Sequence, residues 1–254
     1  MQNGESAGGF RSIKMKKLLY LCVAMLLASC EKEHMCDCFK GTGDIITESR
    51  EASPFHSIDV QKKVDVIIRE GNSFAISVEA GEHIINGVET RISGDVLYIT
   101  NKNKCNWVRS YDEPMKVYVT APTLRYVYQR GNGNITSDGS LGYDTLYLET
   151  WNSGNISLQN EAKVLESRQH VSVGDVTLSG IAEKIYVYNN GNGFSYLSGL
   201  YAKVADVDAR GTGETQVRAD SLLHYHLSGI GNLYLYGAAT VTGTNTGSGS
   251  VIRE

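Results

Sequence analysis

The stretch 191–233 reads GNGFSYLSGLYAKVADVDARGTGETQVRADSLLHYHLSGIGNL and contains three copies of one pattern, Gly-x-Gly-x followed by alternating apolar residues. Four more copies occur between residues 131 and 254, and the second glycine of the seven falls at 133, 154, 174, 193, 213, 231 and 249. Successive positions differ by 21, 20, 19, 20, 18 and 18 residues. A nearly constant period of this length is typical of a solenoid, in which each repeat forms one rung that stacks on its neighbours.

Apolar side chains recur at fixed positions after each glycine pair. The second position after the pair is occupied by Ile135, Ile156, Val176, Ser195, Thr215, Leu233 and Val251. The fourth position is occupied by Ser137, Leu158, Leu178, Leu197, Val217, Leu235 and Arg253. In stacked strands, equivalent residues lie about 4.8 Å apart, so these columns predict interior ladders of side chains.

The glycines are expected at the corners of the rungs, where the chain turns sharply and positive φ angles are easily adopted. The third repeat breaks the register before Gly174, which suggests a β-bulge. These features predict an all-β, single-stranded solenoid with rungs of about 20 residues. An antiparallel β-sandwich or roll is the alternative fold.

The N-terminus has the pattern of an export signal. Basic residues between Lys14 and Lys17 precede an apolar run over 18–27, which is followed by Ala28, Ser29 and Cys30. This order predicts a signal region over 1–29 with translation starting at Met15, and the run is too short for a stable membrane span. The ending resembles a bacterial lipoprotein signal, in which Cys30 becomes the lipidated first residue. An ordinary secretory signal is the alternative.

Residues 30–40 are then expected to form a lipidated tether, and residues 41–254 the solenoid. Three further cysteines remain. Cys36 and Cys38 are too close together for an easy mutual disulfide, so either could pair with Cys105, and a metal site is the other interpretation. The formal net charge is −4, and no basic patch suggests a nucleic-acid partner.

Outward-facing positions before each glycine pair form the candidate binding surface. Tyrosines occupy them at one end of the repeat region, namely Tyr126, Tyr128, Tyr147, Tyr186 and Tyr188. In the third repeat, the same alignment places Ser167 and Gln169 outside. Tyrosine combines a rigid ring with a polar tip, which suits contact with a glycan or a protein. Alternatively, tyrosine is there only because it is a good residue for an exposed strand.

The other end of this surface carries acids and histidines. Asp206 and Asp208 lie one repeat before His224 and His226, so these four side chains are a weak candidate for a metal site. Simple cross-strand Asp–His pairing is the other interpretation. No phosphate loop, calcium repeat or nucleophile elbow is present, and no cofactor is expected.

The order of motifs resembles the head GIN domain family of auto-transporter adhesins, exported lipoproteins common in Bacteroidetes. The resemblance covers roughly residues 41–254. The motifs that carry it are Phe55-x-x-Ile58-x-Val60, Val64-x-Val66-x-Ile68, the Gly71 turn, Val78-x-Ala80, Leu97-x-Ile99, Pro122-x-Leu124 and the glycine rungs. It implies a right-handed β-helix-like solenoid with a non-catalytic role at the cell surface or in the periplasm, and it supplies no catalytic residues.

The expected function is therefore that of a non-enzymatic, lipid-anchored adhesin of the outer membrane, on its surface or periplasmic side, which binds a glycan or protein. The alternatives are a structural envelope module without a ligand and a polysaccharide-cleaving β-helix enzyme. The enzyme would use acids and neutralising cations chosen from Asp206, Asp208, Glu149, Arg130 and Arg210. The last rung, 247–254, is a possible contact with a second copy, because solenoid ends expose unpaired edges.

Overall fold

The computed structural model describes residues 41–104 and 115–254, and β-strand is the predominant secondary structure in these residues. One 3-10 helix, η1 (Ile85–Gly87), is present. The strands of the N-terminal part are β1 (Ile45–Arg50), β2 (Ser57–Val60), β3 (Asp65–Glu70), β4 (Ala75–Gly81), β5 (Val88–Ser93), β6 (Val96–Asn101) and β7 (Lys116–Ala121). The strands of the repeat region are β8 (Tyr126–Gln129), β9 (Ile135–Leu141), β10 (Thr145–Thr150), β11 (Ile156–Gln169), β12 (Val176–Asn189), β13 (Ser195–Ala209), β14 (Thr215–Leu227), β15 (Leu233–Tyr236), β16 (Thr240–Asn245) and β17 (Val251–Arg253).

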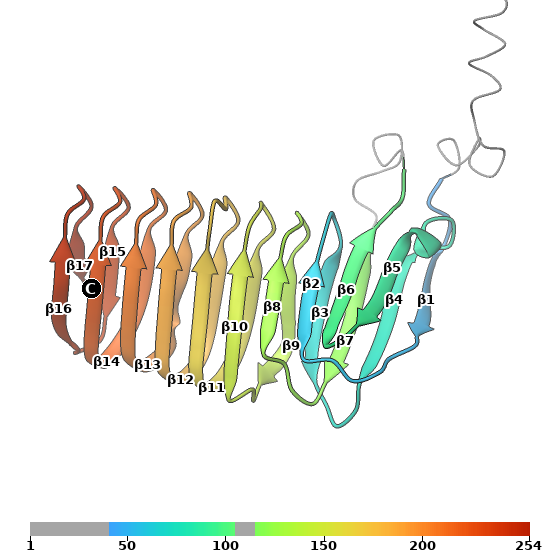
Figure 1. Ribbon diagram of the computed structural model, residues 1–254, viewed down its shortest axis with the longest axis horizontal. Helices are drawn as coiled ribbons and strands as arrows, with labels where there is room; N and C mark the ends of the chain where they lie inside the picture. Colours follow the sequence, from blue (N-terminus) through green and yellow to red (C-terminus); the bar gives the residue numbers. More distant parts are fainter. Residues whose placement is uncertain (1–40, 105–114) are drawn as a thin grey trace, which may run out of the picture. The chain divides into compact units, whose positions relative to one another are not determined.

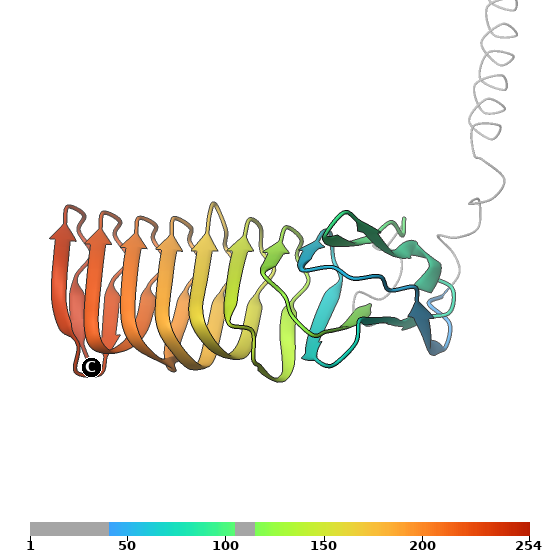
Figure 2. The same cartoon turned by 60° about the horizontal axis from the view of Figure 1, so that its bottom comes forward.

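The repeat region is a right-handed solenoid with two faces (Figures 1 and 2). Face 1 consists of β2, β6, β8, β10, β16 and the second halves of β11 to β14, which run upward on the near side of Figure 1. Face 2 consists of β3, β7, β9, β15, β17 and the first halves of β11 to β14. All pairings between rungs of the repeat region are parallel, so the antiparallel sandwich is excluded.

The rungs of the N-terminal part are not stacked in chain order. The rung β2–β3 lies between the rung β6–β7 and the rung β8–β9. The three antiparallel pairings, β1 with β4, β4 with β7 and β5 with β6, lie at this end of the solenoid. These strands cover the edge that the first rung would otherwise expose, which is the usual role of a terminal cap.

The predicted interior ladder is confirmed. Leu158, Leu178, Leu197 and Leu235 are all buried, and the parallel register pairs Leu158 with Leu178 and Leu197 with Val217. Each fully buried leucine contributes roughly 1.5–3 kcal/mol by removing apolar surface from water. Because one rung alone could not enclose these side chains, stacking is what stabilises the fold.

The third repeat corrects one sequence-based assignment. Ser167 and Gln169 are buried, and Glu166 and Arg168 occupy the outer positions beside Tyr186 and Tyr188. The cause is one extra residue in the corner. The Gln169 amide donates to the carbonyl of Gly174, five residues later in the chain. In other corners, Gln129, Asn189 and Asn245 each donate to the carbonyl of a glycine four residues later. Side chains along a strand point alternately inward and outward. An assignment made by counting back from Gly174 that ignores the extra residue therefore exchanges the inward and outward residues of this repeat.

The corner glycines are needed for close packing between rungs and not for positive φ. Within the described residues, positive φ angles are found at other glycines and at Lys62. A Cβ added at Gly213 would lie 1.9 Å from the carbonyl oxygen of Gly193 in the preceding rung. Only glycine allows the corners to stack at this distance.

Amide side chains brace several corners, and those of Gln129 and Asn189 are buried. The Nε2 atom of Gln129 donates to the Gly133 carbonyl at 2.8 Å, and its Oε1 accepts from the Gly131 N–H at 2.8 Å. Asn189 and Asn245 make the same pair of bonds in their own corners. These bonds satisfy backbone groups that the sheet cannot pair, which fixes the corner geometry.

Candidate functional site

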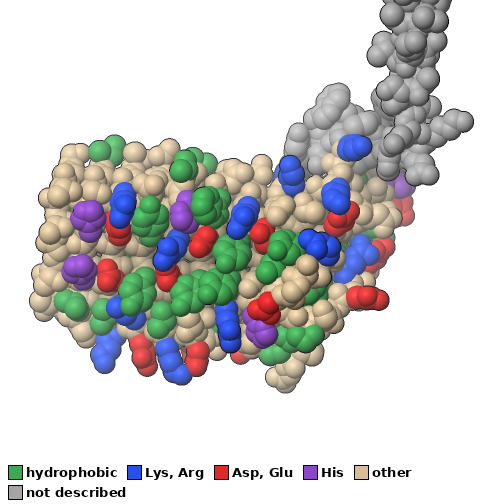
Figure 3. Space-filling view, in the orientation of Figure 1, with side chains coloured by type: hydrophobic (Ala, Val, Ile, Leu, Met, Phe, Trp, Pro, Cys, Tyr) green, Lys and Arg blue, Asp and Glu red, His purple; other side chains and the backbone are tan. Residues whose placement is uncertain are grey.

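The outer side of face 1 is the candidate site, and its side chains form two columns across the rungs. The first column contains Tyr126, Tyr147, Glu166, Tyr186, Asp206 and His224. The second contains Tyr128, Glu149, Arg168, Tyr188, Asp208 and His226. Figure 3 shows this side of the molecule, with apolar, acidic, basic and histidine side chains interspersed along the rungs.

Three of the five predicted tyrosines form one cluster. The rings of Tyr126 and Tyr147 are stacked with centroids 4.9 Å apart, and those of Tyr126 and Tyr128 are parallel at 6.0 Å. Tyr186 and Tyr188 lie on the same face, but the rung that carries Glu166 and Arg168 separates them from the cluster around Tyr147. Stacked rings on adjacent strands stabilise a sheet, so the cluster has a structural role as well.

Cations cover several of the ring faces. The guanidinium of Arg130 lies 5.2 Å from the Tyr128 ring centroid, and that of Arg210 lies 5.3 Å from the Tyr188 centroid. The Lys184 ammonium lies 4.1 Å from the Tyr186 centroid. With faces engaged in this way, ring edges and hydroxyl groups remain for contact with a partner, which favours hydrogen bonding over ring stacking.

The Tyr128 phenol is a neutral hydrogen-bonding group. Partial burial, and next the negative charge of Glu149, raises the pKa of Tyr128 above its ordinary value. A phenol of this kind keeps its proton at neutral pH and can both donate and accept hydrogen bonds. That combination suits sugar hydroxyls and peptide groups equally.

Trp151 and His170 belong to this surface, although the sequence analysis did not single them out. Their rings are stacked with centroids 3.9 Å apart, and the His170 ring lies 5.7 Å from that of Tyr188. The Trp151 Nε1–H donates to Glu149 Oε2 at 3.2 Å. Both residues immediately follow the last buried position of face 1, and their location at a corner is the sequence signal that could have identified them.

The acid and histidine end forms two separate pairs. His224 Nδ1 lies 3.3 Å from Asp206 Oδ1, and His226 Nδ1 lies 3.1 Å from Asp208 Oδ1. Within residues 41–104 and 115–254, no group of three or more potential metal ligands converges. The predicted gathering of these four side chains into one site is therefore not what the structure shows, because each histidine stands opposite a single aspartate in the parallel register.

Asp208 is held as a carboxylate. Its partial burial alone would raise the pKa, but hydrogen bonds from Arg210 and His226 outweigh this effect and lower it. The Arg210 Nη2 atom donates to Asp208 Oδ2 at 2.6 Å, and Arg210 Nε donates to Oδ1 at 2.9 Å. Since the carboxylate and the guanidinium bind each other, neither is presented as a free acid, base or neutralising cation.

The other candidate catalytic groups are also engaged. Glu149 accepts from Trp151 and lies 3.6 Å from His170 Nε2, and Arg130 lies 3.4 Å from the Asp59 carboxylate. An open groove of about 660 Å³ lies at the edge of the solenoid opposite the glycine corners. Ile181, Tyr201 and charged side chains line it. It contains none of the five groups proposed for polysaccharide cleavage.

Four predicted residues, Cys30, Cys36, Cys38 and Cys105, lie outside the described residues, so their lipidation or pairing stays a prediction. Across the described part of the chain, no helix is long and apolar enough to cross a membrane.

Solved structures of the same fold come from Bacteroides and Parabacteroides species. A putative adhesin from Bacteroides fragilis matches with a TM-score of 0.77 and 20% identity, over 85% of this chain and 100% of that one. A putative adhesin from Parabacteroides distasonis matches with a TM-score of 0.66 and 18% identity, over 84% and 98%. A putative lipid binding protein from the same species matches with a TM-score of 0.64 and 18% identity, over 85% and 100%. At these identities, the likeness establishes the fold alone.

Among proteins with curated descriptions, none matches this sequence significantly. One family model, described as "Putative auto-transporter adhesin, head GIN domain", matches residues 54–239. The match covers most of the chain and includes the capped N-terminal rungs together with the tyrosine columns of face 1. The chain therefore belongs to this head GIN domain family.

Proposed function

We propose that this protein is a lipid-anchored, non-enzymatic adhesin of the cell envelope and that face 1 binds a glycan or a protein. Membership of an adhesin family supports the general role. The export signal ending at Cys30 supports lipid anchoring, and the outer membrane is the proposed location.

The observation that carries the proposal is the rigid arrangement of polar tips on face 1. Tyr126, Tyr128 and Tyr147 hold one another by ring stacking, and Arg210 and Asp208 hold each other by paired hydrogen bonds. Side chains that are ordered before binding lose little conformational entropy when a partner arrives. Tyrosine-rich paratopes of antibodies exploit the same property.

The absence of catalysis is part of the proposal and is supported by the pairing of the acids. Glycoside-cleaving enzymes use two carboxyl groups, one of which must carry a proton at working pH. Asp208 is instead tied to Arg210 and His226, and its pKa is lowered, so it is poorly suited to act as a proton donor. Assays for new reducing ends and unsaturated uronates on a polysaccharide panel should stay at background.

A glycan array and a pull-down from envelope extract test the binding role. We expect the wild-type protein to retain a defined glycan or protein in one of the two experiments. If both remain blank with correctly folded protein, the adhesin role is wrong and a structural envelope module takes its place.

Two cell experiments test anchoring and location. Mass spectrometry of the N-terminal peptide should show lipid on Cys30, and Cys30→Ala should release the protein from the membrane fraction. Protease treatment of intact cells should then degrade the protein if it is displayed on the surface. Resistance of the intact cells, with degradation after lysis, would place it on the periplasmic side and would contradict a role in attachment to other cells or surfaces.

A further inference from the structure

One edge of the solenoid, which we name the corner edge, differs from the rest of the surface. It consists of the segments between face 1 and face 2 in successive rungs and of the residues that follow β6. These segments are 61–64, 102–103, 130–134, 151–155, 170–175, 190–194, 210–214, 228–232 and 246–250. In Figure 1 they form the row of loops along the top.

The middle of the corner edge carries exposed apolar side chains. Val171 is 83% exposed, Val173 is 60% exposed and Trp151 is 48% exposed. The Val173 N–H donates to the Asn152 carbonyl at 3.2 Å, so the two corners that carry these side chains are adjacent. Most other corners have glycine, asparagine, serine or threonine at the equivalent places. The extra residue in the third corner is therefore accompanied by two valines that face solvent.

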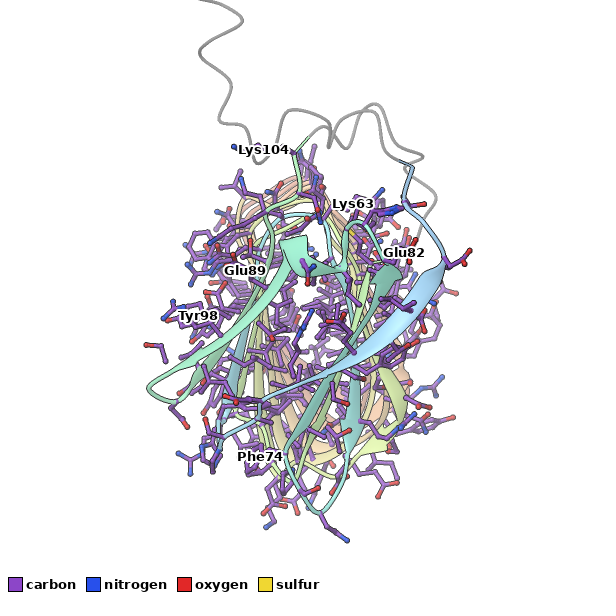
Figure 4. All side chains as sticks on the ribbon, turned by 90° about the vertical axis from the view of Figure 1, so that its right-hand side faces the viewer. Lys63, Phe74, Glu82, Glu89, Tyr98 and Lys104 are labelled. Carbon is purple, nitrogen blue, oxygen red and sulfur yellow. The ribbon has the colours of Figure 1, made fainter. Side chains whose placement is uncertain are left out.

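The N-terminal end of the same edge is basic. The segments that define the corner edge contain five basic residues, which are Lys62, Lys63, Lys102, Arg130 and Arg210, against two acidic ones, Asp175 and Glu214. Four of these five, Lys62, Lys63, Lys102 and Arg130, lie in the rungs nearest the capped end. Figure 3 shows blue side chains at the upper right of the molecule, and Figure 4 shows Lys63 near the top of this end.

The described chain also begins at this edge. Strand β1 starts at the top of Figure 1 and runs downward, and the Asp44 carbonyl accepts from the N–H of Glu82, which Figure 4 shows at the upper right. Thr42 lies twelve positions after Cys30, so the chain between them spans at most about 40 Å when fully extended. A lipid on Cys30 therefore keeps the start of β1, and with it the capped end of the corner edge, within about 40 Å of the bilayer.

These three features coincide on one edge, and each is favourable at a lipid surface. Exposed Trp and aliphatic side chains insert at the boundary of headgroups and acyl chains, and lysine and arginine are attracted to anionic headgroups. We propose that the corner edge lies on the membrane to which the protein is anchored, with Trp151, Val171 and Val173 in the interface and the basic end on phosphate groups. This inference depends on the lipid anchor proposed above.

The consequence is a defined orientation. Both faces then stand upright on the bilayer, and the tyrosine columns of face 1 remain accessible from the side. The edge with the groove around Ile181 and Tyr201 points away from the lipid.

Trp151 allows a direct test in the lipidated full-length protein. The chain has two tryptophans, so Trp107→Phe leaves Trp151 as the single reporter. The protein is reconstituted into vesicles of anionic phospholipid with brominated acyl chains, which quench tryptophan within the bilayer. We expect Trp151 emission to be quenched at least about twofold relative to vesicles without bromine, as for a ring at the acyl boundary.

Matched variants separate insertion from general exposure. Val171→Asp combined with Val173→Asp should abolish the quenching, whereas Ile181→Asp should retain it, because Ile181 is 59% exposed on the opposite edge. Circular dichroism checks that each variant is folded. Unquenched Trp151 in a protein that carries lipid on Cys30 would overturn the inference and leave the anchor intact. Absence of lipid on Cys30 would overturn both.

Discussion

Replacing one corner glycine by alanine gives a sharp test of how the rungs stack. In Gly213→Ala, the new Cβ would lie 1.9 Å from the Gly193 carbonyl oxygen, whereas ordinary contacts need about 3.5 Å. The two corners must therefore separate by roughly 1.5 Å, given that contact distance. Two hydrogen bonds that join these rungs at the corner would lengthen, from Thr212 N–H to Gly191 O at 3.0 Å and from Ser195 N–H to Glu214 O at 2.9 Å.

The expected cost follows from these contacts. Two weakened hydrogen bonds contribute about 1 kcal/mol each, and forced overpacking adds about 1–3 kcal/mol. We expect Gly213→Ala to lower the free energy of unfolding by about 3–5 kcal/mol, measured by urea denaturation followed by circular dichroism.

The control is a glycine in the same strand region that has room for a side chain. A Cβ added at Gly199 would meet its nearest neighbour, the Ser179 Cβ, at an ordinary 3.4 Å. Gly199→Ala should therefore change stability by less than about 1 kcal/mol, in either direction. If both variants unfold at the same urea concentration as wild type, the corner glycines do not maintain the rung spacing and the reasoning is wrong.

Three further predictions concern stability. Leu178→Ala removes a buried member of the interior ladder and should cost about 3 kcal/mol in urea denaturation, and a loss below 1 kcal/mol would mean that the ladder is loosely packed. Gln169→Leu leaves the Gly174 carbonyl without its 3.0 Å side-chain donor and should cost about 1–3 kcal/mol, whereas an unchanged midpoint would show that the corner does not need the amide. Because the folded pKa of Asp208 is lowered, its contribution is present above the unfolded pKa of about 3.9 and is lost as pH falls through the folded value. Asp208→Asn should therefore be less stable than wild type at pH 7, with the gap closing in acid, and a gap that widens below pH 4 would contradict the lowered pKa.

Much of the fold could be predicted from the spacing of glycines and aliphatic residues. The period located the corners, and the positions of Leu158 and Leu178 located the interior, because both follow from stacking parallel strands at a fixed distance. The reason given for the glycines was wrong. Positive φ is a property of one residue, but the contact between Gly213 and Gly193 involves two rungs and becomes visible only when they are stacked.

The third repeat shows why outward positions are harder to assign. A single extra residue after Gln169 exchanges the inner and outer sets, so Gln169 braces a corner where an exposed position was expected. The amides at Gln129 and Asn189, four residues before their glycines, carry the signal that could have revealed this. The sequence contains no comparable signal for the stacking order of the N-terminal rungs. That order depends on the pairing of β2 with β6 and β8, which are distant from it in the chain.

The positions of the candidate site residues could be predicted in part. The tyrosines do share one face, but their ring faces are largely covered by neighbours such as Arg130 and Lys184, which spacing along the chain cannot show. The Asp–His columns were also located correctly, although the parallel register pairs each histidine with one aspartate and keeps the two pairs apart.

The claim that face 1 is the binding surface is tested most directly by the affinity of two matched variants for the partner captured from the envelope. Tyr126 is 38% exposed on face 1, and Tyr196 is 37% exposed on face 2. Tyr126→Ser combined with Tyr147→Ser should weaken binding at least about tenfold, as expected for loss of central aromatic contacts, while Tyr196→Ser should leave Kd unchanged. Equal affinity of the face 1 variant and wild type, or an equal loss in Tyr196→Ser, would contradict the account.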